Sequence, residues 1–221
     1  MKNKLAITAL FLFSVRLSYS QSNRLYLSYG IMNFSTNSEI GGEEIFYEYG
    51  NDWSLKFEYP VYKNIFISVG LGIYESAISV PFIGSFENGE RITIKSSPIK
   101  VRYFQSPISI IYKSRSKKIT PILEIGTVLA RKYKSQEGEV LLFGNSIPTS
   151  ITHLYSDNLT RLNLSFGLEY KFPKQVKFQF SIGYHRDLSH SIKDNQSNSK
   201  EVSKIYFDGI SFRFAICLLS I

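Results

Sequence analysis

Side chains able to perform acid–base and nucleophilic chemistry cluster between residues 185 and 190. His185, Asp187 and Ser189 alternate with other residues, and His190 follows directly. Residues two apart in a strand point to the same side, so the first three would share one face. A serine hydrolase needs a histidine within hydrogen-bonding reach of the hydroxyl and an acid that orients the histidine. Same-face neighbours are about 6–7 Å apart, so the sequence leaves their convergence open, and solvated loop residues are the simpler interpretation.

The other potential metal ligands form no recognisable motif. The chain has three histidines, including His153 in a predicted loop, and a single cysteine, Cys217. Their spacing matches no metal-binding pattern, and one cysteine cannot form an intramolecular disulfide framework. We therefore expect no metal and no cofactor, and we interpret Cys217 as a small residue of a wall or lumen.

Six charged residues alternate with bulky apolar neighbours and would share the polar faces of their strands. They are Lys56, Glu58, Glu124, Glu169, Lys177 and Arg213. If these faces enclose a narrow lumen, the charges must pair or contact water, because an unpaired buried charge is costly. We predict a structural network of salt bridges and hydrogen bonds that fixes the register of the strands. A gated polar pathway remains the alternative.

The elements that would position these residues are strands, because apolar and polar residues alternate through most of the chain. Eight segments show this period of two, which is typical of β-strands. Bulky aliphatic and aromatic residues occupy one face, while glycine, serine, alanine and scattered charges occupy the other. Small residues suit a crowded lumen and large apolar residues suit a lipid-facing wall. The sequence therefore predicts an all-β fold, an eight-stranded antiparallel up-and-down transmembrane β-barrel. The segments are 25–31, 53–59, 65–73, 107–112, 123–130, 162–170, 176–185 and 210–218.

The connections between these segments alternate strictly in length. Three are short and four are long, and in outer-membrane barrels short turns face the periplasm while long loops face outwards. Both termini would then be periplasmic. The short connections lie at 60–64, 114–118 and near 173–174, and the long ones at roughly 35–51, 81–98, 135–158 and 188–203.

Two of the long loops carry further strand signals. Asn88-Gly89 lies between two apolar stretches and is a strong hairpin signal. Val140–Phe143 indicates a second hairpin or a short cap, whereas Ser189–Ser203 is polar.

Aromatic residues collect near both expected boundaries of the membrane. This pattern is typical of the two aromatic girdles of outer-membrane barrels. The expected girdles contain Tyr59, Tyr112, Tyr170 and Phe172 at the periplasmic side and Tyr29, Trp53, Tyr74 and Tyr184 at the outer side.

The N-terminus has the features of a secretory signal peptide. Two lysines precede the apolar run Leu5–Val15, and small residues precede Gln21. The run is shorter than the roughly 20 apolar residues of a membrane-spanning helix. We expect a signal peptide over residues 1–20 and one mature domain, the barrel, over residues 21–221.

The charge of the chain does not indicate nucleic-acid binding. The formal net charge is +8, and the three basic residues of the expected signal peptide reduce this to +5 for the mature chain. Acidic and basic residues are mixed without a basic run. Tyrosine and phenylalanine, at 15 and 17 residues, are instead abundant and favour strands.

The central part of the chain, Ser97–Tyr133, resembles the PorT-like outer-membrane β-barrel family. The later segments GLEYKF and SIGYHRDLS are also similar to that family. The resemblance spans most of the mature chain, includes no catalytic motif, and implies an outer-membrane barrel. One member of the family belongs to a protein-secretion machine. The matching elements are Pro107, the Ile108–Tyr112 run, Lys117-Lys118, Pro121 and Gly126.

The leading functional hypothesis is a non-enzymatic barrel of the bacterial outer membrane whose long loops make contacts in envelope structure, assembly or protein secretion. Its expected partners are outer-membrane lipids, the barrel-assembly machinery and envelope or secretion proteins. The alternatives are a small passive channel or carrier for a minor solute or apolar molecule, a hydrolase at the barrel rim, and a soluble binding barrel with an apolar interior.

Overall fold

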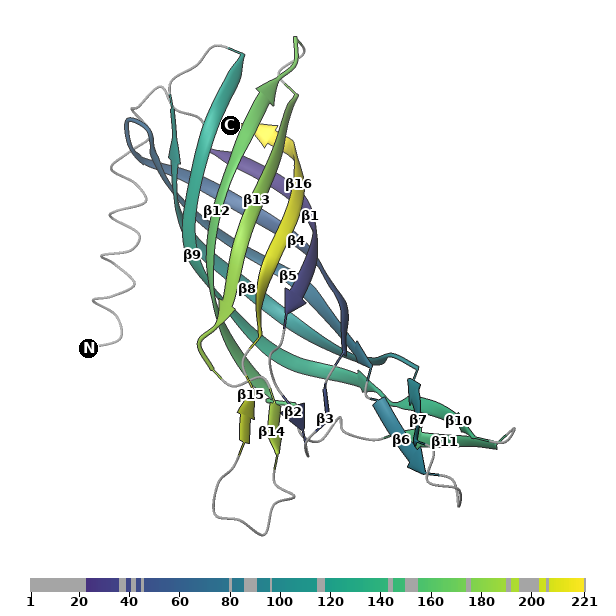
Figure 1. The fold of residues 1–221 in the computed structure, drawn as a ribbon. Coiled ribbons are helices and arrows are strands. Elements are labelled where there is room, and N and C mark those ends of the chain that lie inside the picture. The colour runs from purple at the N-terminus through teal and green to yellow at the C-terminus, as the bar shows by residue number, and fades with distance from the viewer. Residues whose placement is uncertain are drawn as a thin grey trace, which may run out of the picture.

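A computed structural model shows a closed antiparallel barrel of eight strands (Figure 1). Neighbours in the barrel follow chain order, and β1 closes the sheet against the C-terminal strand β16. The predicted fold class is therefore confirmed. The barrel strands are β1 (Arg24–Ser35), β4 (Phe46–Tyr62), β5 (Ile65–Ser79), β8 (Ile99–Lys113), β9 (Ile119–Gln136), β12 (Asn158–Lys171), β13 (Lys177–Asp187) and β16 (Asp208–Ser220).

The structure describes most of residues 23–220, with short gaps. The predicted signal peptide, residues 1–20, lies outside the described residues. No helix in the described part is long and apolar enough to cross a membrane. The described residues are 23–35, 39–40, 43–44, 46–79, 81–85, 91–95, 97–114, 118–142, 145–149, 155–173, 176–189, 192–194, 203–205 and 207–220.

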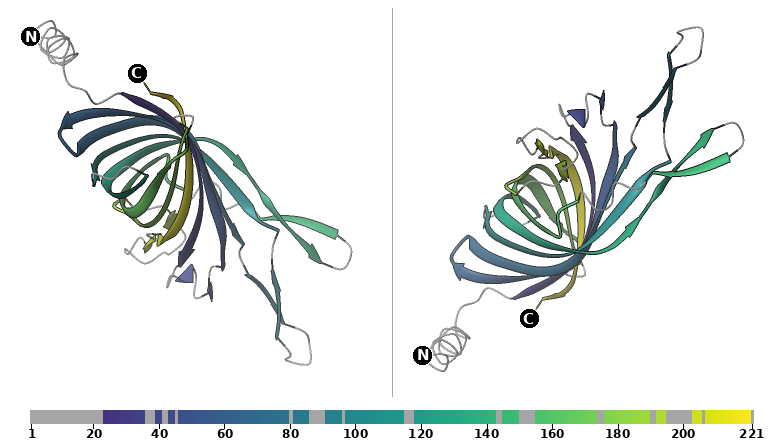
Figure 2. Two further views of the ribbon diagram at one scale, coloured as in Figure 1. Left: turned by 90° about the horizontal axis from the view of Figure 1, so that it is seen from above. Right: turned by 90° about the horizontal axis from the view of Figure 1, so that it is seen from below.

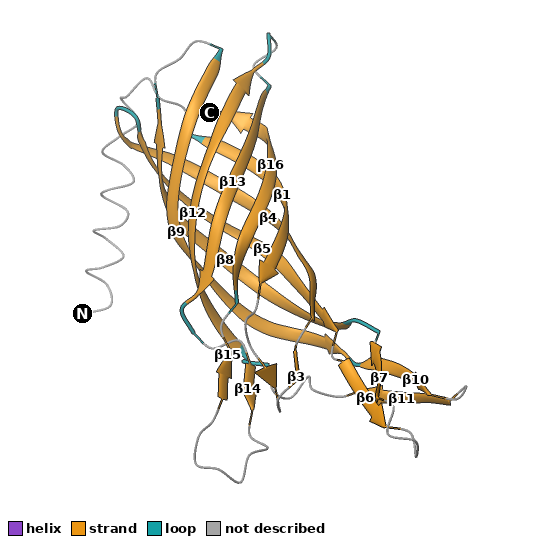
Figure 3. Cartoon of the chain, viewed as in Figure 1, coloured by secondary structure: helices purple, strands orange, loops and turns teal. Residues whose placement is uncertain are grey.

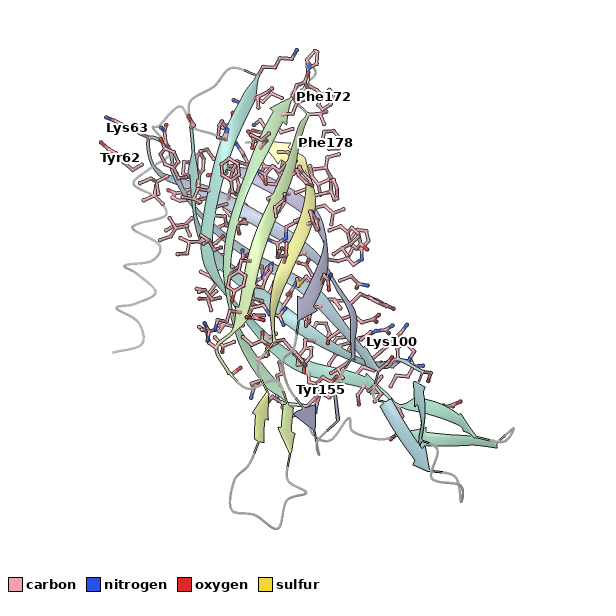
Figure 4. All side chains as sticks on the ribbon, viewed as in Figure 1. Tyr62, Lys63, Lys100, Tyr155, Phe172 and Phe178 are labelled. Atoms are coloured by element: carbon pink, nitrogen blue, oxygen red, sulfur yellow. The ribbon has the colours of Figure 1, made fainter. Side chains whose placement is uncertain are left out.

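The two faces of each barrel strand differ as the alternation predicts. In β8, Ser109 is 5 % exposed, whereas Ile108 and Ile110 are 47 % and 55 % exposed. Side chains such as Phe172 and Phe178 extend outwards near the short-turn end (Figure 4). The wall is therefore apolar outside and polar inside. A soluble binding barrel would have these faces reversed, so that alternative was wrong.

The alternation of short turns and long loops is also confirmed. Short connections follow β4, β8 and β12 at one end, the end at which the chain terminates (Figure 1). At the opposite end, which we call the loop end, two hairpins extend to one side of the barrel (Figures 1 and 2). They are β6 (Pro81–Ser85) with β7 (Arg91–Lys95), and β10 (Gly138–Leu142) with β11 (Asn145–Thr149).

These two hairpins match the two strand signals found in the loops. The last long loop contains the short pair β14 (Ile192–Asp194) and β15 (Ser203–Ile205), and the first long loop contains β2 (Glu39–Ile40) and β3 (Glu43–Glu44). Strands therefore account for nearly all of the described loop residues (Figure 3).

Most barrel strands are longer at the loop end than the sequence pattern indicated, and β5, for example, continues to Ser79 instead of ending at residue 73. β4 begins at Phe46 instead of residue 53, and β8 begins at Ile99 instead of residue 107. Beyond the membrane both faces of a strand meet water or protein, so the apolar alternation stops while the hydrogen-bonded ladder continues. β9 likewise reaches Gln136 and pairs with β8 there.

One member of the expected outer girdle was wrong. Tyr74 is 1 % exposed and stacks inside the barrel against Tyr103, with ring centroids 5.9 Å apart. Its even number places it on the inward face of β5, opposite Ile73. Trp53 and Tyr184 do face outwards, and Trp53 packs against Tyr29 at 4.5 Å.

Candidate functional site: the lumen and the loop end

The middle of the lumen is crossed by an ion pair between two strands that are not neighbours. Lys56 Nζ of β4 lies 2.9 Å from Glu124 Oε1 of β9. Ser109 Oγ donates a second hydrogen bond to the same carboxylate oxygen at 2.8 Å. On the other side, Arg213 Nη2 lies 3.5 Å from Asp52 Oδ2. The mid-lumen charges are therefore compensated across the barrel.

A second cluster fills the lumen near the short turns, and Lys113 is its centre. Its Nζ lies 2.5 Å from Glu58 Oε2 and 2.9 Å from Glu169 Oε2. Tyr26 donates its hydroxyl proton to Glu169 at 2.7 Å, and Arg24 lies 3.3 Å from the same carboxylate. One cation thus joins carboxylates of β4 and β12, and β1 adds two further donors.

A third ion pair lies toward the loop end. Arg161 Nε lies 2.7 Å from Asp187 Oδ1, and both side chains are almost fully buried. The Arg161 guanidinium also lies 4.4 Å from the ring centroid of Tyr74.

Tyr155 lies nearby, in the connection before β12. Burial raises the pKa of the Tyr155 phenol well above its ordinary value, so this hydroxyl stays neutral.

Little space remains between these clusters. The interior cavity bordered by Lys56, Glu124 and Arg213 has a volume of only about 10 Å³, which is room for about one water molecule. Small residues are needed to achieve this packing. A side chain on Gly126 would overlap Ser109 Cβ of the neighbouring strand. The described lumen is therefore a packed polar core rather than an open pore, as is typical of barrels with eight strands.

Five of the six charges selected from the sequence lie in this core. Lys56 and Glu124 pair directly, Glu58 and Glu169 share Lys113, and Arg213 pairs with Asp52, as given above. Lys177 differs. It is half-buried at the short-turn rim, and its Nζ donates to Ser220 Oγ at 3.1 Å. As the first residue of β13 it lies beyond the level of Glu169, and within the described residues it forms no ion pair.

Sequence reasoning did not assign five charged partners to this core, although it considered one of them, Asp187, as the acid of a hydrolase. Each lies one or two residues beyond the segment whose apolar alternation was clear. Lys113, for example, has the same parity as Ser109 but follows the last alternating residue, Tyr112. Extending the inward parity to the strand ends would have found all five. They are Arg24, Asp52, Lys113, Arg161 and Asp187.

The residues of the hydrolase hypothesis do not converge on one another. His185 Nε2 lies 2.5 Å from Ser211 Oγ, while Asp187 pairs with Arg161. Ser189 Oγ accepts the backbone N–H of Thr160 at 2.8 Å. His185 is buried in the lumen, so its interpretation as a solvated loop residue was wrong. His190 and His153 lie outside the described residues.

Among the described residues, no third member of a catalytic set lies beside the His185–Ser211 pair. His185 Nδ1 is buried, and no hydrogen-bond partner for it is present among the described residues. Nothing there orients the ring for proton transfer. In the same part of the chain, no group of three His, Cys, Asp or Glu side chains could hold a metal ion. Cys217 is a half-buried free thiol near the end of β16.

Comparisons with known proteins identify the architecture. No model of a known protein family matches the sequence, and no curated protein matches it. Among solved structures, the outer membrane protein OprG from Pseudomonas aeruginosa matches with a TM-score of 0.51 and 9% identity, over 90% of this chain and 96% of that chain. Neisserial surface protein A matches with a TM-score of 0.48 and 11% identity, over 88% and 96% of the two chains. The outer membrane protein AlkL matches with a TM-score of 0.46 and 14% identity, over 94% and 95%. The fold is that of the eight-stranded barrels of bacterial outer membranes.

These similarities show the fold and agree with an outer-membrane location, but they do not determine the activity. The matching structures include outer-membrane enzymes as well as proteins not named as enzymes. The resemblance to the PorT-like family stays a prediction, since no family model matches.

Proposed function

We propose that this protein is a non-enzymatic outer-membrane barrel whose loop-end hairpins contact other proteins of the cell envelope, in envelope structure, assembly or secretion. In this proposal the termini and short turns face the periplasm and the hairpins face outwards. The observation that supports it most is the projection of β6–β7 and β10–β11 far beyond the barrel mouth and to the same side (Figures 1 and 2).

The backbone of these hairpins is suited to protein contacts. Each forms a separate two-stranded sheet, so among the described strands each hairpin strand has one edge without a neighbouring strand, although Ser97 bonds Glu139 on the edge of β10. Such edges can pair with a strand of another protein. The packed lumen supports the same proposal, because a barrel that transports little through its interior must act through its surface.

Shortening both hairpins tests this proposal. We expect a variant with residues 81–95 and 138–149 replaced by short turns to form the heat-modifiable barrel on gels, because all eight barrel strands remain. It should fail to complement the envelope defect of a deletion strain, whereas the intact chain should complement that defect. A matched variant shortened only at residues 192–205, in another loop of the same end, should restore it. Full complementation by the first variant would refute the proposal.

The second candidate function, a passive channel, predicts measurable conductance. We expect the purified barrel to show no discrete conductance steps in planar bilayers, because the ion pairs at Lys56 and Lys113 leave an interior cavity of about 10 Å³. Discrete conductance steps at low voltage, seen in both orientations of the protein and with barrels whose folding is verified on gels, would favour the channel over the binding barrel.

A further inference from the structure

The hydrogen-bonded ladder of the barrel wall is interrupted at one place between β5 and β8. Val69 pairs with Ile108, and the next pair is Gly72 with Gln105. The register is the same on both sides, so two successive positions lack ladder pairing without a bulge. On its other side β8 remains continuously paired with β9 through the same level.

Pro107 explains the interruption. Backbone groups of alternate residues in a strand point to the same neighbour, and Lys113 N donates to Asn64 O at the edge of β5. Residues of β8 with odd numbers therefore direct their N–H groups toward β5. Proline has no N–H, so the position that faces Gly70 cannot donate. The Pro107 ring is buried, and a Cβ on Gly70 would lie only 3.0 Å from it.

A hollow of about 810 Å³ lies over this part of the wall. Three consecutive residues from each of four adjacent strands line it, namely 71–73, 104–106, 129–131 and 158–160. The side chains that line it are mostly outward-facing, so the hollow opens on the apolar outer surface. Its volume is in the range of about 300–1,000 Å³ typical of ligand pockets.

Differences in side-chain size explain the shape of this hollow. Ser106 and Gly72 are small and form its floor, whereas Phe104 and Leu129 border it. Leu71, beside the interrupted ladder, is 72 % exposed, the highest value among the described large apolar side chains. A single flexible hydrocarbon chain can follow this floor and fill the space between the bordering side chains.

The loop-side end of the hollow is polar and cationic. Arg131 and Asn158 line it there. The next level of the wall has the Arg102–Glu75 ion pair, and Asp157 pairs with Lys132. Arg131 is exposed, and in the described part of the chain it has no ion pair. The cation is thus available at the level where the apolar wall ends.

We propose that this hollow binds one acyl chain of an anionic membrane lipid, with the lipid phosphate beside Arg131. The acyl chain lies along Ser106 and Gly72, between Leu71 and Leu129. The phosphate replaces water around the Arg131 guanidinium. The planar guanidinium can donate two hydrogen bonds to the phosphate oxygens. The protein thereby holds a specific lipid against the interrupted seam of its wall.

The only tryptophan of the chain can report this binding. Trp53 faces outwards and lies directly across from Ile73, a lining residue; such cross-strand neighbours are about 5 Å apart. Phosphatidylcholine vesicles holding the barrel would be supplemented with phosphatidylglycerol whose acyl chains carry bromine, a fluorescence quencher. Brominated phosphatidylcholine provides the comparison. We expect quenching by the anionic lipid to saturate at low mole fraction, and quenching by phosphatidylcholine to rise only with mole fraction.

Two pairs of variants separate the acyl and phosphate contacts. Ser106→Phe should fill the floor and abolish the saturable quenching, whereas Thr127→Phe, also outward-facing but outside the lining, should retain it. Arg131→Gln should weaken anionic-lipid binding about fivefold, as expected for one cation near a lipid surface. Lys134→Gln, exposed on the same strand, should change it less than twofold.

The outcomes that would overturn the proposal are distinct. Quenching that follows mole fraction alone for both lipids would refute the site. Equal saturable quenching by both lipids would refute the preference for an anionic lipid, because phosphatidylcholine also carries a phosphate. Equal effects of Arg131→Gln and Lys134→Gln would refute the contact between Arg131 and the phosphate. Saturable quenching that persists in a folded Ser106→Phe barrel would refute the acyl contact. If Ser106→Phe does not fold on heat-modifiability gels, the comparison of the two cation variants decides.

Discussion

Replacing Lys113 with methionine is expected to lower the free energy of unfolding of the barrel by about 3–5 kcal/mol, the usual cost of leaving a buried charge without its partner. Lys113 is the cation shared by Glu58 and Glu169, which are 1 % and 0 % exposed. Its removal leaves both carboxylates in the lumen with weaker compensation from Arg24 and the Gln179 amide. Urea unfolding in phospholipid vesicles, followed by Trp53 fluorescence, measures the change.

A matched lysine at the same end of the barrel provides the control. Lys177→Met removes a half-buried lysine that donates to Ser220 and forms no ion pair in the described chain, so we expect a change within about 0.5 kcal/mol. Adding Glu58→Gln to Lys113→Met should recover part of the loss, because in the described chain Glu58 forms its ion pair with Lys113 alone, whereas Glu169 keeps Arg24 as a partner. Equal losses for Lys113→Met and Lys177→Met would contradict the central role of Lys113.

Replacing Gly126 with leucine is expected to destabilise the barrel by about 1–3 kcal/mol, the range for overpacking a filled core. A Cβ at this position would overlap the Ile108 carbonyl oxygen and Ser109 Cβ. The same substitution at the next residue, Thr127→Leu, places the added atoms on the lipid side. We expect that change to be within about 0.5 kcal/mol.

The same urea unfolding measurement compares the two leucine variants. The two variants carry the same new side chain at adjacent positions, one facing the lumen and the other facing lipid. A Gly126→Leu variant that loses no stability would show that the lumen at this level is not closely packed, and equal losses in both variants would show that the loss does not come from overpacking of the lumen.

The architecture could be predicted from the sequence because lipid imposes a regular pattern on the wall. Most outward-facing residues are apolar where the strand crosses the membrane, and Ile108 and Ile110 around Ser109 follow this rule. The rule ends where lipid ends. The loop-end parts of β4 and β8 were therefore missed, although their ladders continue.

The lumen could be predicted only in part. The alternation of side chains along each strand was enough to place Lys56 and Glu124 on inward faces. It could not show that they meet, because β5 and β8 separate their strands and the distance depends on the barrel's diameter and stagger. The contact of His185 was missed for a different reason. Its partner Ser211 lies on the neighbouring strand β16, and the register between β13 and β16 could not be predicted across the long loop that separates them in the sequence.

The ion pairs that cross the lumen have a consequence for the order of folding. Arg213 and Asp52 come from strands near opposite ends of the chain, and they meet when β1 and β16 have joined, while Lys56 and Glu124 pair across the lumen from β4 and β9. An open, partly inserted sheet would hold these charges in the membrane without partners. Loop-closure entropy already makes such long-range contacts slow to form. Closure of the barrel and burial of its charges should therefore be one cooperative event. Partly assembled sheets should then be unstable in the bilayer and poorly populated during insertion.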